Sequence, residues 1–158
     1  MTATPIYKLN TRKFCAHAMG LMLGMLVLGG SQAAQPANPN TKESTMWISI
    51  AERRFAISLA DNPAARAFAA QLPMTLDMEE LNGNEKMFDL PTALPQNPSR
   101  PGTIRNGDLM LYGARTLVLF YMTFDSSYSY TRLGRVDDPT GLEQALGQRG
   151  VRVIFSKD

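Results

Sequence analysis

Beyond residue 33, this chain of 158 residues contains no histidine and no cysteine. Its single cysteine, Cys15, and its single histidine, His17, both lie near the N-terminus. The rest of the chain therefore cannot form a His-centred catalytic triad, a Cys nucleophile, a Cys/His zinc site or a disulfide. The same absence argues against a serine hydrolase, because no histidine is present to activate Ser126, Ser127 or Ser129. These absences favour recognition over covalent chemistry.

The residues after position 33 also lack an excess of charge of one sign. Lys8, Arg12 and Lys13 are the only charged residues before residue 34, so 16 − 3 = 13 basic residues follow them, together with all 14 acidic residues. This near balance provides no basic footprint of the kind that binds nucleic acid. We therefore expect no nucleic-acid partner.

Patterns typical of metal and nucleotide sites are absent as well. The acidic residues within 77–80 and 137–138 lack the alternating spacing around a glycine that a calcium loop requires. Met74 and Met78 alternate as on a strand, which favours core packing over copper binding. No glycine-rich phosphate loop occurs. We expect no metal and no other cofactor.

The first 33 residues are arranged like a Sec-type signal peptide. Basic residues end at Lys13, the stretch 14–30 is uncharged and rich in Leu, Met and Gly, and small residues at 31–33 place cleavage near Ala33. We expect a periplasmic or secreted protein with no membrane segment after cleavage. The polar, Pro- and Asn-rich residues 34–45 are predicted to form a flexible linker, and 46–158 a single domain.

Short patterns of alternating apolar and polar residues dominate the predicted domain and indicate β-strands. Ile48 and Ile50, for example, alternate with Trp47 and Ser49. The strand patterns are a hairpin at 46–59 and single strands at 74–79, 85–90, 108–112, 116–121, 132–136 and 151–155, with loops at 91–102 and 124–130.

Two short helices interrupt the strands. Asn62 is a suitable N-cap with Pro63 at the first helical position, and Pro73 ends that segment. A capping-box pattern from Thr140 to Glu143 predicts the second helix. Seven or eight short strands with two short helices indicate a mostly β fold, a small closed β-barrel rather than a sandwich.

A series of short segments runs in order along the domain: Asp61-Asn62-Pro63, Leu72-Pro73, Leu81-Asn82-Gly83-Asn84-Glu85-Lys86, Leu90-Pro91, Gly107-Asp108-Leu109, Leu119-Phe120-Tyr121 and Leu133-Gly134-Arg135. Together they resemble the bacterial cyclophilin-like fold domains, a family of small proteins of largely unassigned role. The resemblance covers nearly all of 46–155 and implies a cyclophilin-type barrel of about eight strands capped by two helices. True cyclophilins carry a catalytic Arg followed by a Phe, then a Gln before a Gly-Gly stretch. No segment here reproduces that run, so the resemblance implies the barrel without the isomerase site.

Eight residues are candidates for ligand contacts. Glu85 and Lys86 follow an Asn-Gly turn, where they would place an acid and a base at a barrel rim or simply form a charged turn pair. The Ser/Tyr-rich loop at 124–130 resembles surfaces on which rigid aromatic rings bind ligands, although strands also bury alternate aromatics in a core. The candidates are Glu85, Lys86, Tyr112, Tyr121, Phe124, Tyr128, Tyr130 and Arg132.

The function expected from these features is a non-catalytic module that binds a small molecule or a peptide segment. One alternative is a divergent peptidyl-prolyl cis-trans isomerase of the cell envelope, in which Arg105, Arg115 or Arg132 would face the prolyl nitrogen beside an apolar wall. In the structural alternative these arginines are surface charges or ion-pair partners. A third possibility is an accessory or structural partner protein. The oligomeric state stays open.

Overall fold

The computed structural model describes residues 45–158. The predicted signal peptide (1–33) and all but the last residue of the predicted linker (34–45) lie outside the described residues.

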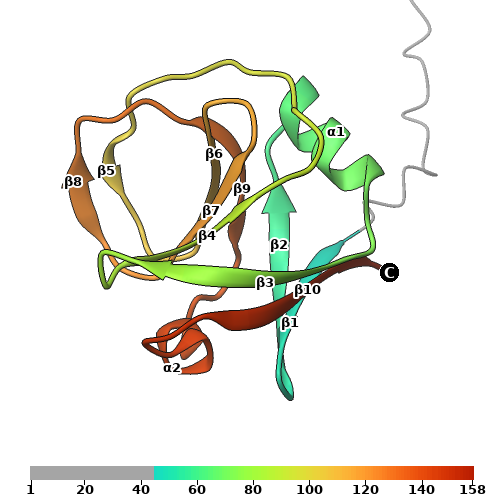
Figure 1. Cartoon of the computed structure of the whole chain (residues 1–158), viewed down its shortest axis with the longest axis vertical. Coiled ribbons are helices and arrows are strands. Elements are labelled where there is room, and N and C mark those ends of the chain that lie inside the picture. Colours follow the sequence, from blue (N-terminus) through green and yellow to red (C-terminus); the bar gives the residue numbers. More distant parts are fainter. Residues whose placement is uncertain (1–44) are drawn as a thin grey trace, which may run out of the picture. The chain divides into compact units, whose positions relative to one another are not determined.

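Eight antiparallel strands close into a barrel in the order β1–β10–β3–β4–β7–β6–β9–β2 (Figure 1). Their bounds are β1 (Met46–Ile50), β2 (Arg53–Leu59), β3 (Met74–Leu81), β4 (Glu85–Asp89), β6 (Asp108–Tyr112), β7 (Thr116–Phe120), β9 (Thr131–Val136) and β10 (Val151–Lys157). A separate two-stranded ribbon pairs β5 (Gly102–Ile104) with β8 (Phe124–Ser126). The predicted mostly β fold with a closed barrel of about eight strands is confirmed.

Helix α1 (Pro63–Ala70) begins as predicted. The Asn62 Oδ1 accepts a hydrogen bond from the Ala65 amide at 2.9 Å, and Pro63 occupies the first turn, where its missing N–H needs no partner. Phe68 of this helix is fully buried and packs edge-to-face on Phe155 of β10, with ring centroids 5.5 Å apart. Helix α1 therefore adds its apolar face to the core inside the barrel.

Helix α2 (Leu142–Leu146) is confirmed, but the capping box predicted for its start is wrong. Its N-cap is Gly141, with a φ of 77°, and no side chain caps the helix. The Thr140 amide instead donates to the Asp138 carboxylate, and Arg53 donates to the Thr140 and Gly141 carbonyls. The chain enters the helix through a left-handed residue, a conformation that glycine adopts without steric cost.

The barrel interior is filled by side chains. Leu142 and Leu146 of α2 join the same buried cluster as Phe68 and the inward-facing residues of seven of the eight barrel strands, and Phe88 of the remaining strand, β4, packs against that cluster. The barrel closes tightly where β2 meets β9, since a Cβ on Gly134 would lie 2.6 Å from the Ser58 carbonyl oxygen. The interior is a packed core rather than a channel, so a ligand site has to lie elsewhere on the domain.

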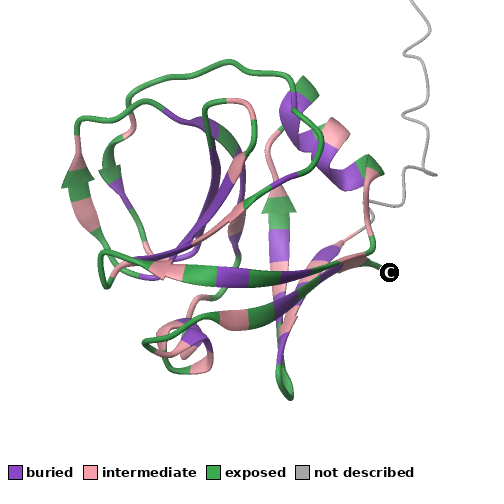
Figure 2. Ribbon diagram, in the orientation of Figure 1, coloured by how far each residue is buried: buried purple, intermediate pink, exposed green. Residues whose placement is uncertain are grey.

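Strands β6 and β7 are buried on both faces (Figure 2). Leu117 and Leu119 point into the barrel core, whereas Val118 and Phe120 point outward. The outward side chains form a second core with residues of β5, β6 and β8 and with Tyr130, which directly precedes β9. Its members are Ile104, Met110, Val118, Phe120 and Tyr130, with Phe124 packed against them. This second core explains why 116–121 is the most apolar strand of the sequence.

The segment 124–130, predicted to be a loop, contains β8. Its three residues are too few to show an alternating pattern, and its pairing with β5 depends on Phe124 and Ile104 packing against Phe120 on the outer face of β7. The segment 91–102, predicted to be a loop, is an ordered loop as far as residue 101, and Gly102 begins β5 instead. The loop is held by the buried Leu94, whose amide donates to the Ala114 carbonyl.

Candidate functional site

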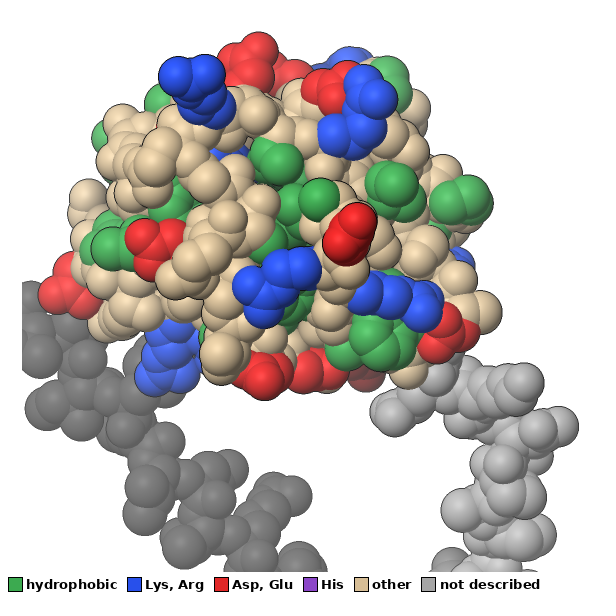
Figure 3. Space-filling model, turned by 90° about the horizontal axis from the view of Figure 1, so that it is seen from below, with side chains coloured by type: hydrophobic (Ala, Val, Ile, Leu, Met, Phe, Trp, Pro, Cys, Tyr) green, Lys and Arg blue, Asp and Glu red, His purple; other side chains and the backbone are tan. Residues whose placement is uncertain are grey.

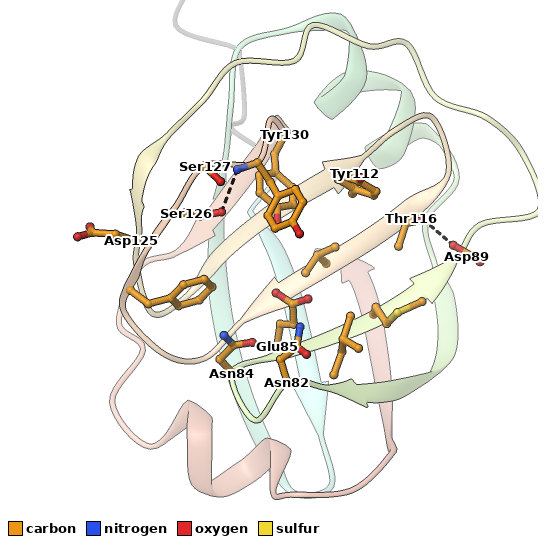
Figure 4. A pocket seen from close by; sticks show the side chains of 15 residues that line it. Asn82, Asn84, Glu85, Asp89, Tyr112, Thr116, Asp125, Ser126, Ser127 and Tyr130 are labelled. Atoms are coloured by element: carbon orange, nitrogen blue, oxygen red, sulfur yellow. Dashed lines mark hydrogen bonds between the residues drawn. The ribbon is translucent and has the colours of Figure 1, made fainter.

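A cavity of about 540 Å³ lies on the outer face of the barrel, between β4, β7 and the segment that runs through β8 towards β9 (Figure 4). Its volume lies within the range of small-molecule sites in proteins. The residues that line it are Leu81, Asn82, Asn84, Glu85, Met87, Asp89, Tyr112, Thr116, Val118, Phe124, Asp125, Ser126, Ser127, Tyr128 and Tyr130.

The pairing register decides which residues face this cavity. Side chains alternate along a strand, so the partners of an outward residue also point outward. Glu85 pairs with Phe120, and Met87 pairs with Val118. Because Phe120 and Val118 belong to the second core outside the barrel, Glu85 and Met87 face outward too, into the cavity.

Glu85 forms the polar centre of the cavity. Its side chain is only 8% exposed and points from β4 towards the middle of the space (Figure 4). No hydrogen bond or ion pair within residues 45–158 engages its carboxylate. Burial, together with the nearby negative charge of Glu80, raises the pKa of Glu85 to about 7.

Aromatic rings make up one wall of the cavity. Tyr112 packs on Tyr128 and Tyr130, with ring centroids 6.2 and 5.7 Å apart, and Phe120 packs on Tyr130 at 5.5 Å and on Phe124 at 5.8 Å. Tyr130 is nearly buried, while Tyr112 and Tyr128 are 48% and 62% exposed. Rings packed against one another keep fixed positions, so this wall is formed before any ligand arrives.

Lys86 and Tyr121 lie on the opposite side of the sheet from Glu85. The fully buried Lys86 ammonium donates to the Glu80 carboxylate and to the carbonyls of Gly147 and Arg149, at 2.8 and 2.7 Å for the carbonyls. The Tyr121 hydroxyl donates to the same carboxylate at 2.8 Å. Lys86 thus ties β3 and β4 to the chain that follows α2, and its donors are used within the fold.

Glu80 shows how strongly this inner network is paired. Partial burial alone would raise its pKa, but the hydrogen bonds from Lys86 and Tyr121 bring the pKa of Glu80 below its ordinary value. Burial and the Glu80 carboxylate raise the pKa of the Tyr121 hydroxyl. The Glu80–Lys86–Tyr121 network therefore holds its charges in place and leaves none free for a ligand.

The arginines considered for isomerisation lie outside the cavity. Arg132 is half-exposed and pairs with the buried Asp108 carboxylate at 3.1 Å, which Arg135 also contacts at 3.1 Å. Arg115 donates to the Pro91 carbonyl at 2.7 Å. Neither these residues nor Arg105 line the cavity.

Of the eight candidate residues, the structure thus brings five together: Glu85, Tyr112, Phe124, Tyr128 and Tyr130. Sequence reasoning missed the neighbours that complete the lining, such as Asn84, Met87 and Thr116. One signal was available for Met87, because it stands two residues from Glu85 and so shares its face. The contribution of Thr116 depends on cross-strand register, which no local pattern contains.

Other features of the described residues bear on ligands and partners. Within 45–158 no group of three or more His, Cys, Asp or Glu side chains is placed to hold a metal ion, and no helix has the length and apolarity to span a membrane. On the face that carries α2 and the turn between β1 and β2, acidic and basic side chains are interspersed (Figure 3).

Comparison with known proteins adds the family to this description. No curated protein matches the chain. The model of the cyclophilin-like family matches residues 48–156, which is most of the chain and nearly all of the described barrel. The chain therefore belongs to the cyclophilin-like family.

Proposed function

We propose that this cyclophilin-like domain is a non-catalytic binding module that takes a small molecule or a short peptide segment in the cavity beside β4. One observation carries the proposal: a preformed aromatic wall and a buried, unpaired carboxylate face the same 540 Å³ cavity. Apolar walls with a few convergent polar groups are the usual composition of ligand sites.

The side chains around the cavity support binding rather than catalysis. Ser126 and Ser127 have no histidine beside them, since the described residues contain none. An isomerase would place an arginine beside an apolar surface, and in residues 45–158 none of the cavity-lining side chains is an arginine. The tyrosine hydroxyls and the amides of Asn82 and Asn84 are suited to hydrogen bonds with a bound ligand.

A thermal-shift screen against metabolite and peptide pools tests the proposal. We expect at least one hit that raises the melting temperature of the wild-type protein and loses its effect in Tyr128→Ala, whose ring is 62% exposed and contributes little to the core. Ile154→Ala is the matched control, because Ile154 is an exposed apolar residue of β10 outside the cavity. If no pool raises the melting temperature, or if Tyr128→Ala leaves every hit unchanged, the proposal fails.

We also propose that the protein works in the periplasm or outside the cell, on the basis of the basic, apolar and small-residue order of its first 33 residues. Mass spectrometry of the protein recovered from cells should find a new N-terminus near Ala34. Recovery of the protein from the cytoplasm with its first residues intact would contradict this proposal.

The isomerase alternative stays a prediction, and a protease-coupled assay on a short proline peptide tests it. A rate equal to the uncatalysed one would end it, whereas a rate that Arg132→Ala or Arg105→Ala removes would support it. The accessory alternative is tested by pull-down from a periplasmic extract, in which a partner that also binds Tyr128→Ala would favour a surface other than the cavity.

A further inference from the structure

The charges around the cavity are all of one sign. Glu85, Asp89 and Asp125 are among its lining residues, and within the described part of the chain no Lys or Arg side chain lines it. Asp89 accepts a hydrogen bond from Thr116 and Asp125 one from Thr103, so both are engaged at the rim. An anionic ligand would meet repulsion here without a compensating cation.

Glu85 is the one buried carboxylate of the three, and it lacks the partner that buried charges ordinarily have. The Glu85 side chain points into the cavity, on the side where Tyr130 lies (Figure 4). Burial raises the pKa of Tyr130, and the charge of Glu85 raises it further. The neighbouring Asn84 adds an Oδ1 acceptor that has no donor within the described residues. Two acceptors among the lining residues, the Glu85 carboxylate and the Asn84 Oδ1, are therefore without a donor within the described residues.

The walls are suited to the same kind of ligand. Aromatic faces attract cations through their quadrupole, and Tyr112 and Tyr128 present partly exposed rings at the mouth. Leu81, Met87 and Val118 supply apolar surface beside them. A bare metal ion is a poor match, because hard cations require several oxygen ligands and only Glu85 offers a free carboxylate.

We propose that the cavity takes a protonated amine attached to an apolar group, with Glu85 as its counter-ion and the tyrosine rings as its walls. This proposal rests on the binding function proposed above. The N–H groups of an ammonium donate to the Glu85 carboxylate, while the apolar body covers Leu81, Met87 and Val118. A free amine and the lysine side chain of a peptide share this chemistry.

Calorimetric titration of the purified protein with matched probes tests the proposal. The probes are 2-phenylethylamine, the neutral 2-phenylethanol and the anionic 3-phenylpropionate, and a second arm uses a short acetylated and amidated Gly-Lys-Gly peptide. We expect the amine or the lysine peptide to bind about tenfold or more tightly than the neutral probe, as for a charge-assisted hydrogen bond, and the anion to bind most weakly. The arm that binds more tightly identifies the source of the ammonium group.

Glu85→Gln keeps the size of the side chain and removes its charge, so it should abolish the preference for the amine. Glu52→Gln makes the same chemical change at an exposed position between β1 and β2 and should leave the preference intact. Equal binding of the amine and the alcohol to the wild-type protein would overturn the proposal, with no variant required. Hits in the thermal-shift screen that show no preference for cations would also overturn it while leaving the binding module standing. If neither the calorimetric probes nor any compound of the thermal-shift pools binds, both the binding function and the preference for amines are wrong.

Discussion

Glu85 and Lys86 are consecutive residues of β4, and both are buried charges, yet their surroundings are opposite. Lys86 points into the barrel and uses its ammonium on Glu80 and on two carbonyls after α2. Glu85 points outward into a cavity and has no partner within the described residues. One charge is satisfied by the fold, and the other is left for something outside it.

The difference shows how one strand can serve stability and binding together. Side chains change face at every residue, so a single strand contributes to two environments. The inner face of β4 meets α2 and β3, which complete its hydrogen bonds. Its outer face meets the segment from β8 to β9, which stands away from the barrel and leaves a space. Three predictions test this division.

The largest expected effect is on the inner face. Lys86→Met should lower the free energy of unfolding by about 3 kcal/mol, because it leaves the Glu80 carboxylate and two carbonyls without their donor. Urea denaturation measures this loss. Lys157→Met is the matched control at an exposed lysine and should change stability by less than about 0.5 kcal/mol. Equal effects of the two substitutions would mean that the inner network contributes nothing.

The second prediction concerns Glu85, on the outer face of β4, whose replacement should raise the free energy of unfolding rather than lower it. The pKa of Glu85 is raised to about 7 in the folded protein, above its ordinary value of 4.5, so the folded state holds a proton that the unfolded state loses. Its contribution to stability is therefore present at low pH and is lost as the pH rises through about 7. Because solvent in the cavity screens part of this effect, Glu85→Gln should be about 2 kcal/mol more stable than wild type at about pH 8, and equally stable at about pH 4.

Urea denaturation of both proteins across this pH range measures the difference. A gap that does not change with pH would show that Glu85 titrates normally and is not desolvated by the cavity. Glu80, Tyr121 and Tyr130, the ionisable groups that interact electrostatically with Glu85, are present in both proteins, so their own titration largely cancels in the comparison.

The smallest predicted change in stability concerns Tyr121 in the Glu80–Lys86–Tyr121 network. Tyr121→Phe keeps the ring in the core and removes one hydroxyl from the Glu80 carboxylate, so it should lower the free energy of unfolding by about 1 kcal/mol. Because Tyr121 faces the inner side, the variant should also leave ligand binding in the cavity unchanged. Loss of binding in Tyr121→Phe would show that the two faces are coupled.

Local sequence patterns predicted most of the barrel. The alternation in 74–79 and 151–155 and the turn signals at Asn82 and Asn106 depend on residues close in the chain, and the strands found there agree with them. Strand β8 and the start of α2 were missed or misjudged because they depend on distant partners. Phe124 needs Ile104 and Phe120 to become part of a strand and a core, and Thr140 is held by Arg53 rather than by Glu143.

The candidate site divides in the same way. The sequence pointed to the region around Glu85 and the tyrosines of 128–130, because an acid after a turn and a Ser/Tyr-rich loop are visible locally. It could not separate Glu85 from Lys86, nor Tyr112 from Tyr121. That separation requires knowing which face of each strand meets the core.

By itself, the amino-acid sequence determined the class of fold, the positions of most strands and the absence of His and Cys chemistry beyond residue 33, because these follow from composition and from short-range periodicity. Only the tertiary structure decided that the barrel interior is filled, that a second core holds the β5–β8 ribbon on the outer face, and that Glu85 rather than Lys86 faces the cavity. The reason is that strand pairing joins residues far apart in the chain, and a shift of one residue in that pairing would exchange the two faces.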